Sequence, residues 1–325
     1  MKKNSIWITW ENQRRNRELS KALGIKLFEL SEVDQIKSRF KKYVIGITKT
    51  LKIYIRERPN IVFCQNPSLI LSLFFVLLKK LAGIKVVVDA HNGGLFPKEG
   101  RSLLLGHIAR FVQRKADLTV VTNESLKKHV ESNGGRGFVL PDKIPNIPIT
   151  IPKKLKGRVN LLFICSYADD EPYEIVFKAA QNISPEICIY VTGNYQKKGI
   201  QQKQLPDNVV LTGFIPEDEY IEMLNSVDAT IVLTSRENCL VCGAYETVAV
   251  EKPMILSNTN ALKHYFSKGT IYTENTIEGL ESAISDLLRK KDELNTQVRE
   301  LKISRETDWQ KKKEELEKRF FNYSE

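Results

Sequence analysis

The order of apolar runs constrains the fold of this 325-residue chain most strongly. Short β-branched or apolar runs alternate with helix-length amphipathic segments, a pattern typical of βαβ units and a parallel sheet. Strands are predicted in the first half at Ser5–Thr9, Ile61–Cys64, Lys85–Asp89 and Leu118–Thr122. In the second half they are predicted at Val159–Cys165, Ile187–Thr192, Val209–Thr212, Ala229–Thr234, Met254–Ser257 and Thr270–Tyr272. The sequence therefore predicts an α/β protein with two tandem Rossmann-like domains.

A proline-rich segment separates the two series of strands. Four of the twelve prolines fall within Pro141–Pro152, where they remove backbone donors that a helix or a central strand would need. We therefore predict an N-terminal domain at 1–145 and a C-terminal domain at 153–325, with a helix over Thr307–Phe321 that packs back across the domains. Ligands bind at the carboxyl ends of parallel strands, so we expect the functional residues there, beside an interdomain cleft.

Charge is divided unequally between the two halves. Residues 1–150 carry 27 Lys and Arg against 12 Asp and Glu, whereas residues 151–325 carry 23 against 27. This asymmetry indicates that the first half meets a polyanion, either nucleic acid or an anionic membrane, unless the cations form only a solvated surface. No base-reading motif or interleaved aromatic platform accompanies the charge, so we expect no nucleic-acid partner.

Two segments of the first half bear on membrane contact. Gln35–Pro59 is helical in pattern and carries eight Lys or Arg, and Ser68–Gly83 is apolar on nearly every face until Lys79. The second segment is shorter than the ~20 residues that span a bilayer, so burial between sheets and monotopic insertion both remain open. The apolar stripe of the first segment, which could face a core or a bilayer, comprises Phe40, Tyr43, Val44, Ile47, Leu51 and Tyr54.

The stretch SRENCLVCGAYE, Ser235–Glu246, lies between a predicted strand and a predicted helix that begins near Gly243. Helix N-termini offer free N–H groups and a positive dipole end to phosphate, and the small Gly243 and Ala244 allow close approach. Glu246, one turn into the helix, could accept hydrogen bonds from both hydroxyls of a ribose. The pattern therefore favours binding of a nucleoside diphosphate.

The cysteines of this stretch, Cys239 and Cys242, form a Cys-x-x-Cys pair. No second such pair and no cluster of histidines accompanies it, so we expect neither a zinc site nor a redox site, and we interpret both sulfurs as small packing groups between helix and sheet. The five cysteines and the absence of a recognisable secretion signal predict free thiols in a reducing, cytosolic setting.

The run TSRENCLVCGAYETVAVEKPMILSNTNALKHYF, Thr234–Phe266, resembles the donor-binding region of GT-B glycosyltransferases of the family 4 type. The likeness extends to TGNYQKKG, LTGFIPEDEY and FICSYADDEPYEIVFKAA, which fall at strand ends or helix starts. In the first half, QNPSLILSLF and VVVDAHNGG resemble acceptor-domain segments of enzymes that glycosylate lipid-linked sugars, including the dolichol-linked mannosyltransferases.

The resemblance assigns roles by position. It implies that Glu246 binds the ribose, that Gly243 and Ala244 face the diphosphate, and that Arg236 supplies a cation for the leaving group. Glu237 corresponds to the first family glutamate, near the donor sugar, although eight residues rather than seven separate it from Glu246. Four further residues are expected to bind the donor from the quoted stretches: Ser166, Gly193, Gly213 and Asn238.

Two departures from the family pattern stand out. The Arg and Lys pair expected after the first strand of the donor domain is replaced by Ser166-Tyr167-Ala168-Asp169-Asp170-Glu171-Pro172. The glycine-rich loop expected near the N-terminus is replaced by Thr9-Trp10-Glu11-Asn12-Gln13-Arg14. These departures leave retention or inversion at the anomeric carbon open.

Catalytic candidates in the first half follow its third predicted strand. His91 is expected to act as a general base or to position the donor sugar, with Asp89 as the other base candidate or as a residue that orients the loop. Asp169 and Asp170 could pass for a metal motif, but they precede Glu171 and Pro172 at a helix start, which favours a capping role. We therefore expect no metal and no cofactor.

Together these patterns predict a glycosyltransferase that moves a sugar from a UDP- or GDP-sugar to a lipid-linked or glycan acceptor in surface polysaccharide biosynthesis. We expect a cytoplasmic enzyme, peripheral at the inner face of an anionic membrane. The alternatives are a catalytically silent nucleotide-sugar-binding protein and a basic nucleic-acid-binding protein.

Overall fold

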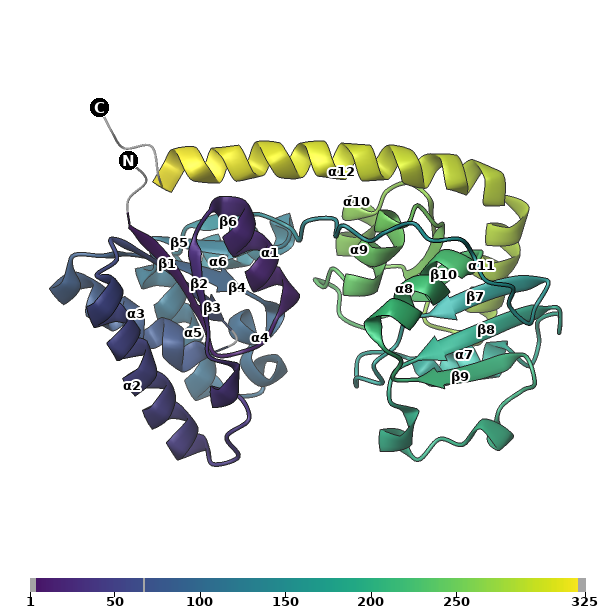
Figure 1. Ribbon diagram of the computed structural model, residues 1–325, viewed down its shortest axis with the longest axis horizontal. Coiled ribbons are helices and arrows are strands. Elements are labelled where there is room, and N and C mark those ends of the chain that lie inside the picture. Colours follow the sequence, from purple (N-terminus) through teal and green to yellow (C-terminus); the bar gives the residue numbers. More distant parts are fainter. Residues whose placement is uncertain (1–3, 67, 321–325) are drawn as a thin grey trace. The chain divides into compact units, whose positions relative to one another are not determined.

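The computed structural model describes residues 4–66 and 68–320, and it divides into two compact units (Figure 1). Unit 1 comprises Met1–Lys143 with Asp308–Glu325, and unit 2 comprises Ile144–Thr307. Among the described residues, each unit contains one six-stranded sheet in which all neighbouring strands are parallel. The predicted α/β class with two Rossmann-like sheets is therefore confirmed.

The sheet of unit 1 has the strand order β2-β1-β3-β4-β5-β6. Its strands are β1 (Ser5–Thr9), β2 (Lys26–Glu29), β3 (Ile61–Asn66), β4 (Lys85–Ala90), β5 (Leu118–Val121) and β6 (Gly137–Val139). The four predicted strands are present, whereas β2 and β6 were not predicted because they are short edge strands without a long apolar run. Chain order reverses between β1 and β3, which opens a crevice at the carboxyl ends of these two strands.

Six α-helices flank this sheet within the described residues. They are α1 (Arg14–Leu23), α2 (Arg39–Glu57), α3 (Leu69–Ala82), α4 (Asn92–Leu95), α5 (Leu103–Lys115) and α6 (Glu124–Ser132), with single 3-10 turns at Ser31–Val33 and Pro97–Gly100. Helix α3 buries Leu71, Phe75 and Val76 in the core, so most of the apolar segment Ser68–Gly83 is a core helix.

The predicted apolar stripe of helix α2 is only partly packed against the core. Ile47 and Tyr54 of its predicted stripe pack against the core, and the Tyr54 ring lies edge-on to Phe75. The remaining stripe residues, Phe40, Tyr43, Val44 and Leu51, are exposed. No helix within the described residues has both the length and the apolar character needed to cross a bilayer.

The sheet of unit 2 has the order β12-β11-β10-β7-β8-β9. Its strands are β7 (Val159–Phe163), β8 (Ile187–Thr192), β9 (Val209–Gly213), β10 (Ala229–Val232), β11 (Met254–Ser257) and β12 (Thr270–Thr273), so all six predicted strands form. The helices are α7 (Tyr173–Ala179), α8 (Glu217–Ser226), α9 (Cys242–Ala249), α10 (Asn260–Tyr265) and α11 (Ile277–Arg289), with 3-10 turns at Tyr195–Lys198 and Gln202–Gln204. Here chain order reverses between β7 and β10, so the loops after these strands flank the crevice.

The last helix, α12 (Lys291–Phe320), is longer than the predicted Thr307–Phe321 segment, whose final residue lies outside the described residues. Its first part buries Leu294, Val298 and Leu301 in unit 2. Its last part belongs to unit 1, where Trp309 is buried and its indole Nε1 donates to Pro141 O at 3.0 Å.

Candidate functional site

Asp89 is the penultimate residue of β4 in unit 1 and is completely buried beside Arg15 of α1. The Arg15 Nη2 lies 2.8 Å from Asp89 Oδ1, and Nε lies 3.1 Å from both carboxylate oxygens. Burial by itself would raise the pKa of Asp89, but Arg15 first and His91 second outweigh it and hold the pKa below its ordinary value. A carboxylate so firmly ionised and paired is a poor proton acceptor, which argues against Asp89 as the base and favours the orienting role.

Arg15 also joins Asp89 to the end of β6. Its Nη1 donates to Asp142 Oδ1 at 2.6 Å and its Nη2 to Leu140 O at 2.8 Å. One buried guanidinium thus connects the loops after β4 and β6 at the carboxyl edge of the sheet.

His91 follows β4 and is the N-cap residue of α4. Its Nε2 lies 3.5 Å from Asp89 Oδ2, and the side chain is half-buried. Among the described residues, Nε2 is buried and has no hydrogen-bond partner. His91 thus lies directly after β4 beside the carboxylate of Asp89, and its role as a base or positioning residue stays a prediction.

In unit 2, the loop after β7 closes on the carboxylate of Glu171. That carboxylate accepts hydrogen bonds from Ser166 N at 2.8 Å and Ala168 N at 3.0 Å, and Ser166 Oγ donates to it as well. Ser166, a predicted donor-binding residue, is thus exposed but engaged within its own loop. A carboxylate here binds the backbone N–H groups that could otherwise meet a phosphate.

The two neighbouring aspartates do not cap α7, contrary to the sequence-based interpretation, because Pro172 is the N-cap residue and no side chain caps the helix. Asp169 instead pairs with Lys198 at 3.1 Å. Asp170 accepts from Thr234 Oγ1 at 2.8 Å and lies 3.3 Å from Arg236 Nη1. These contacts join the loops after β7, β8 and β10.

A cavity of about 230 Å³ opens among these loops. It is lined by Ala168, Asp169, Asp170, Glu171, Pro172, Tyr173, Glu174, Lys198 and Ser235. Four carboxylates against one ammonium group make its wall acidic, so the cavity favours neutral or cationic groups over a diphosphate. Arg236, the predicted cation for the leaving group, lies beside this wall through its ion pair with Asp170.

Glu237 is exposed, and its Oε1 accepts a hydrogen bond from Asn260 N, at the start of α10, at 2.8 Å. The carboxylate therefore holds the loop after β10 to the N-terminus of the next helix. The expected role of Glu237 near the donor sugar, and that of Asn238 in donor binding, stay predictions.

Glu246 lies in α9, and its Oε2 accepts a 2.6 Å hydrogen bond from the hydroxyl of Tyr220 on α8. The side chain is half-buried, so part of the carboxylate remains accessible. Tyr220 therefore fixes the carboxylate at the position from which the sequence predicts ribose binding.

The small residues before Glu246 are buried. A Cβ on Gly243 would lie 3.0 Å from Ile164 Cγ2, so this glycine allows α9 to pack closely against the end of β7. The N–H of Ala244 already donates to Val241 O at 3.2 Å, which removes it from the predicted phosphate contacts.

Gly193 directly follows β8 and Gly213 ends β9, and Gly193 N donates to Gly213 O at 3.0 Å. Gly193 has a φ of +91°, and a Cβ there would lie 2.2 Å from Cys165 O. This glycine is therefore required for the backbones after β7 and β8 to approach each other. Both glycines shape the carboxyl edge of the sheet, where the sequence predicts donor binding.

The cysteines differ from the prediction in one respect. Cys239 is half-buried, as a packing group would be, but Cys242 is exposed at the start of α9, so the packing interpretation is wrong for Cys242. Within the described ranges, no three His, Cys, Asp or Glu side chains gather in a way that could hold a metal ion.

Two doubly wound sheets in tandem, each with polar side chains at its carboxyl edge, define the GT-B class of fold. Residues 150–304, nearly all of unit 2, match the family model described as Glycosyl transferases group 1. The chain is a glycosyltransferase with the GT-B fold. A search of curated proteins finds no match to the sequence.

Solved structures agree with this fold. A sucrose-phosphate synthase from Thermosynechococcus elongatus is similar with a TM-score of 0.76 and 13% identity, covering 98% of each chain. HepE from Anabaena, in complex with UDP and glucose, has a TM-score of 0.74 and 11% identity over 98% of this chain and 99% of its own. A glycosyltransferase from Rickettsia africae has a TM-score of 0.69 and 14% identity over 99% and 100% of the two chains.

Proposed function

We propose that the protein transfers a sugar from a UDP- or GDP-sugar to a lipid-linked or glycan acceptor in surface polysaccharide biosynthesis. One observation supports binding of the nucleotide-sugar donor: the carboxylate of Glu246 accepts a hydrogen bond that orients it, from Tyr220 on α8. Glu246 itself lies on α9, a helix that starts at the carboxyl edge of the parallel sheet. A carboxylate in this place accepts both hydroxyls of a ribose. The UDP complexes of the similar protein HepE support the same donor class.

The diphosphate of the donor would meet the first turn of α9, where the helix dipole favours an anion. Gly243 rather than Ala244 supplies the N–H, because that of Ala244 is already bonded. Arg236 adds the positive charge. Glu171 sits where the family places a cation, so this chain relies on the helix start and Arg236 to stabilise the leaving group.

Calorimetric titration of UDP and GDP tests the donor assignment. The wild-type protein should bind one of the two, and Glu246→Gln should weaken that binding about tenfold or more, because a hydrogen bond to a charged group contributes about 1.5–3 kcal/mol. Glu219→Gln, on an exposed carboxylate of α8, is the matched control and should bind as the wild type does. Equal affinity of the Glu246→Gln protein would overturn the ribose assignment.

The membrane half of the proposal rests on three helices of unit 1. Helix α2 packs beside α3, and α3 beside α5. Each helix carries a strongly exposed apolar residue: Phe40 of α2 is 78% exposed, Leu81 of α3 is 91% exposed and Leu103 of α5 is 80% exposed. Isolated exposed apolar residues are ordinary, but three neighbouring helices that each present them indicate a surface for an apolar partner.

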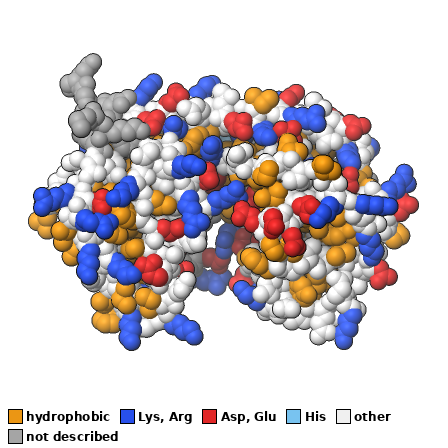
Figure 2. Space-filling view, in the orientation of Figure 1, with side chains coloured by type: hydrophobic (Ala, Val, Ile, Leu, Met, Phe, Trp, Pro, Cys, Tyr) orange, Lys and Arg blue, Asp and Glu red, His pale blue; other side chains and the backbone are white. Residues whose placement is uncertain are grey.

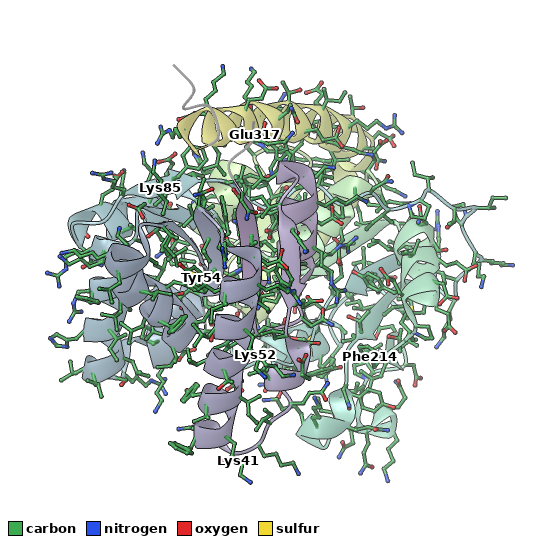
Figure 3. All side chains as sticks on the ribbon, turned by 60° about the vertical axis from the view of Figure 1, so that its left-hand side comes forward. Lys41, Lys52, Tyr54, Lys85, Phe214 and Glu317 are labelled. Carbon is green, nitrogen blue, oxygen red and sulfur yellow. The ribbon has the colours of Figure 1, made fainter. Side chains whose placement is uncertain are left out.

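Cations surround these apolar side chains. Figure 2 shows Lys and Arg side chains interspersed with hydrophobic ones over the region of α2 and α3, and Figure 3 labels Lys41 and Lys52 along α2. The exposed cations on or beside these helices include Arg39, Lys41, Lys52, Arg56, Lys80 and Arg101. Such a surface suits an anionic membrane leaflet, with apolar side chains at the acyl boundary and cations at the headgroups. The proposed setting is therefore the cytoplasmic face of the membrane, where a lipid-linked acceptor is available.

A further inference from the structure

A network of side-chain hydrogen bonds runs along the carboxyl edge of the sheet in unit 1, from Thr9 to Glu11. Thr9 Oγ1 donates to Gln65 Oε1, Gln65 Nε2 donates to Gln13 Oε1, and Gln13 Nε2 donates to Glu11 Oε2 at 2.8 Å. Thr9 and Gln65 are buried, whereas Gln13 and Glu11 are half-buried. The network thus begins in the interior and ends on a half-buried carboxylate.

The direction of this network follows from its Glu11 end. An ionised carboxylate only accepts, so Gln13 donates to it with Nε2 and accepts with Oε1 from Gln65 Nε2. Gln65 Oε1 is then left to accept from Thr9 Oγ1, which also has Glu11 O as a second acceptor at 3.0 Å. A buried polar network is costly unless its members are satisfied, and here each amide is held in one orientation. The result is a Glu11 side chain that receives a hydrogen bond from a rigidly held donor.

This carboxylate lies at the switch point of the sheet. Glu11 follows β1 and Gln65 belongs to β3, the two strands between which chain order reverses. Ligands in doubly wound sheets bind in the crevice at that point. The GT-B glycosyltransferases that the sequence resembles have a glycine-rich loop at this position. Here the segment Thr9–Arg14 replaces that loop, so polar side chains stand where those enzymes expose glycine backbone.

The surroundings of Glu11 show that it is not a structural ion pair. The groups that face it electrostatically are Asp34, Lys42, His91 and Gln13. Within the described part of the chain, its Oε1 accepts no hydrogen bond, and Lys42 pairs instead with Asp34 at 2.5 Å. Burial first, and Asp34 second, raise the pKa of Glu11 above its ordinary value.

The chemistry of the site selects its ligand. A carboxylate oxygen accepts hydrogen bonds from hydroxyl groups, and the half-buried amide of Gln13 lies beside it. The carboxylate of Glu11 repels a phosphate or diphosphate, and the nearby Lys42 is already paired with Asp34. A neutral sugar offers hydroxyl donors without negative charge.

We propose that Glu11, positioned by Gln13, Gln65 and Thr9, binds a hydroxyl group of the neutral sugar acceptor. The inference rests on the proposed transfer function and assigns its acceptor class on unit 1. The lipid or diphosphate part of such an acceptor would lie outside this subsite.

Saturation-transfer NMR with methyl β-D-glucopyranoside as a neutral sugar probe, and with inorganic diphosphate as an anionic one, tests this site on the full-length protein. The wild type should bind the glucoside, and Glu11→Gln should weaken it about tenfold, with Glu11→Asp intermediate. The matched control is Glu32→Gln, an exposed carboxylate of the same unit that pairs with Lys49. The glucoside signal of the wild type, unlike that of Glu11→Gln, should fall as the pH drops and Glu11 is protonated.

Two outcomes would overturn the inference: no response of the wild type to the glucoside, or equal binding by wild type and the Glu11→Gln protein. Binding of diphosphate at this edge would contradict the neutral class. UDP titration of the same proteins separates this inference from the proposed function, because the nucleotide is assigned to unit 2 and its affinity should not change in Glu11→Gln. Coincident melting temperatures for all variants exclude a folding effect.

Discussion

The guanidinium of Arg15 and the carboxylate of Asp89 form a buried ion pair at 2.8 Å, between residues 74 positions apart in the sequence. Asp142 shares the same guanidinium at 2.6 Å. Breaking a buried pair by removal of one partner costs about 3–5 kcal/mol, because the other charge stays buried without compensation. Arg15→Met should therefore lower the free energy of unfolding of unit 1 by about that amount in urea titrations.

The control for that change is an exposed pair in the same unit. Arg17 pairs with Glu29 at 2.7 Å while its own side chain is 53% exposed, and exposed pairs contribute about 0–1 kcal/mol. Arg17→Met should thus leave stability nearly unchanged. Similar losses in both variants would contradict the assignment of a special role to the buried pair.

Acid should weaken unit 1 through Asp89. Its pKa is lower in the folded protein than in the unfolded chain, where an aspartate titrates near about 3.9. The stabilisation is therefore complete above that value and is lost as the pH falls below it. As the pH falls below about 3.9, urea titrations of Asp89→Asn should therefore show a smaller further loss of stability than those of the wild type.

Tyr220→Phe should weaken nucleotide binding without removing a nucleotide contact, because the lost hydroxyl leaves Glu246 without its 2.6 Å hydrogen bond. One hydrogen bond contributes about 0.5–1.5 kcal/mol, so the expected loss of UDP affinity is about two- to tenfold, smaller than in Glu246→Gln. Calorimetry of both single variants and of the double variant checks the coupling. Fully additive effects would show that the two side chains act independently.

Gly193→Ala should destabilise unit 2 strongly. The added methyl would lie 2.2 Å from Cys165 O at a φ of +91°. The backbone conformation alone costs about 1–2 kcal/mol for a residue with a Cβ, and the clash adds to it. Gly199→Ala is the matched control, since its φ is +70° but nothing lies within 4 Å of the added atom. Thermal melts in which both variants lose the same stability would remove the argument for close approach.

Membrane binding should depend on both parts of the proposed surface. Lys41→Glu with Lys52→Glu should reduce flotation with phosphatidylglycerol vesicles about tenfold or more, since each cation near such a surface contributes about 1 kcal/mol. Phe40→Ser with Leu81→Ser should weaken binding even at low salt. Lys178→Glu, an exposed lysine of unit 2, serves as control. Equal binding to neutral phosphatidylcholine vesicles would exclude the electrostatic contribution.

Thiol labelling should distinguish the cysteines. Cys242 is exposed and should react first with a disulfide reagent, followed by the half-buried Cys239. Cys64 should not react in the native state, because burial raises the pKa of its thiol to about 12 and only a thiolate attacks. Rapid modification of Cys64 before Cys242 would show that unit 1 opens more readily than its packed core implies.

Much of the fold follows from local pattern. The alternation of apolar runs and amphipathic segments was enough to place ten of the twelve strands in the described residues, because parallel strands buried on both faces carry near-continuous apolar runs. The edge strands β2 and β6 lack such runs, and their pairing comes from neighbours rather than from their own residues. Motif spacing likewise placed Glu246 and the loop before it on a helix that follows a strand.

The sequence by itself determined the α/β class, the order of the apolar strands and the likeness of unit 2 to group 1 glycosyl transferases. Only the tertiary structure decided the partners of each polar side chain: Arg15 for Asp89, Glu171 for its own loop, Asn260 for Glu237, and the network from Thr9 that positions Glu11. The physical reason is distance along the chain. Hydrophobic periodicity is a local property that each segment carries alone, whereas a hydrogen bond between loops exists only after the sheet has brought the carboxyl ends of its strands to one edge.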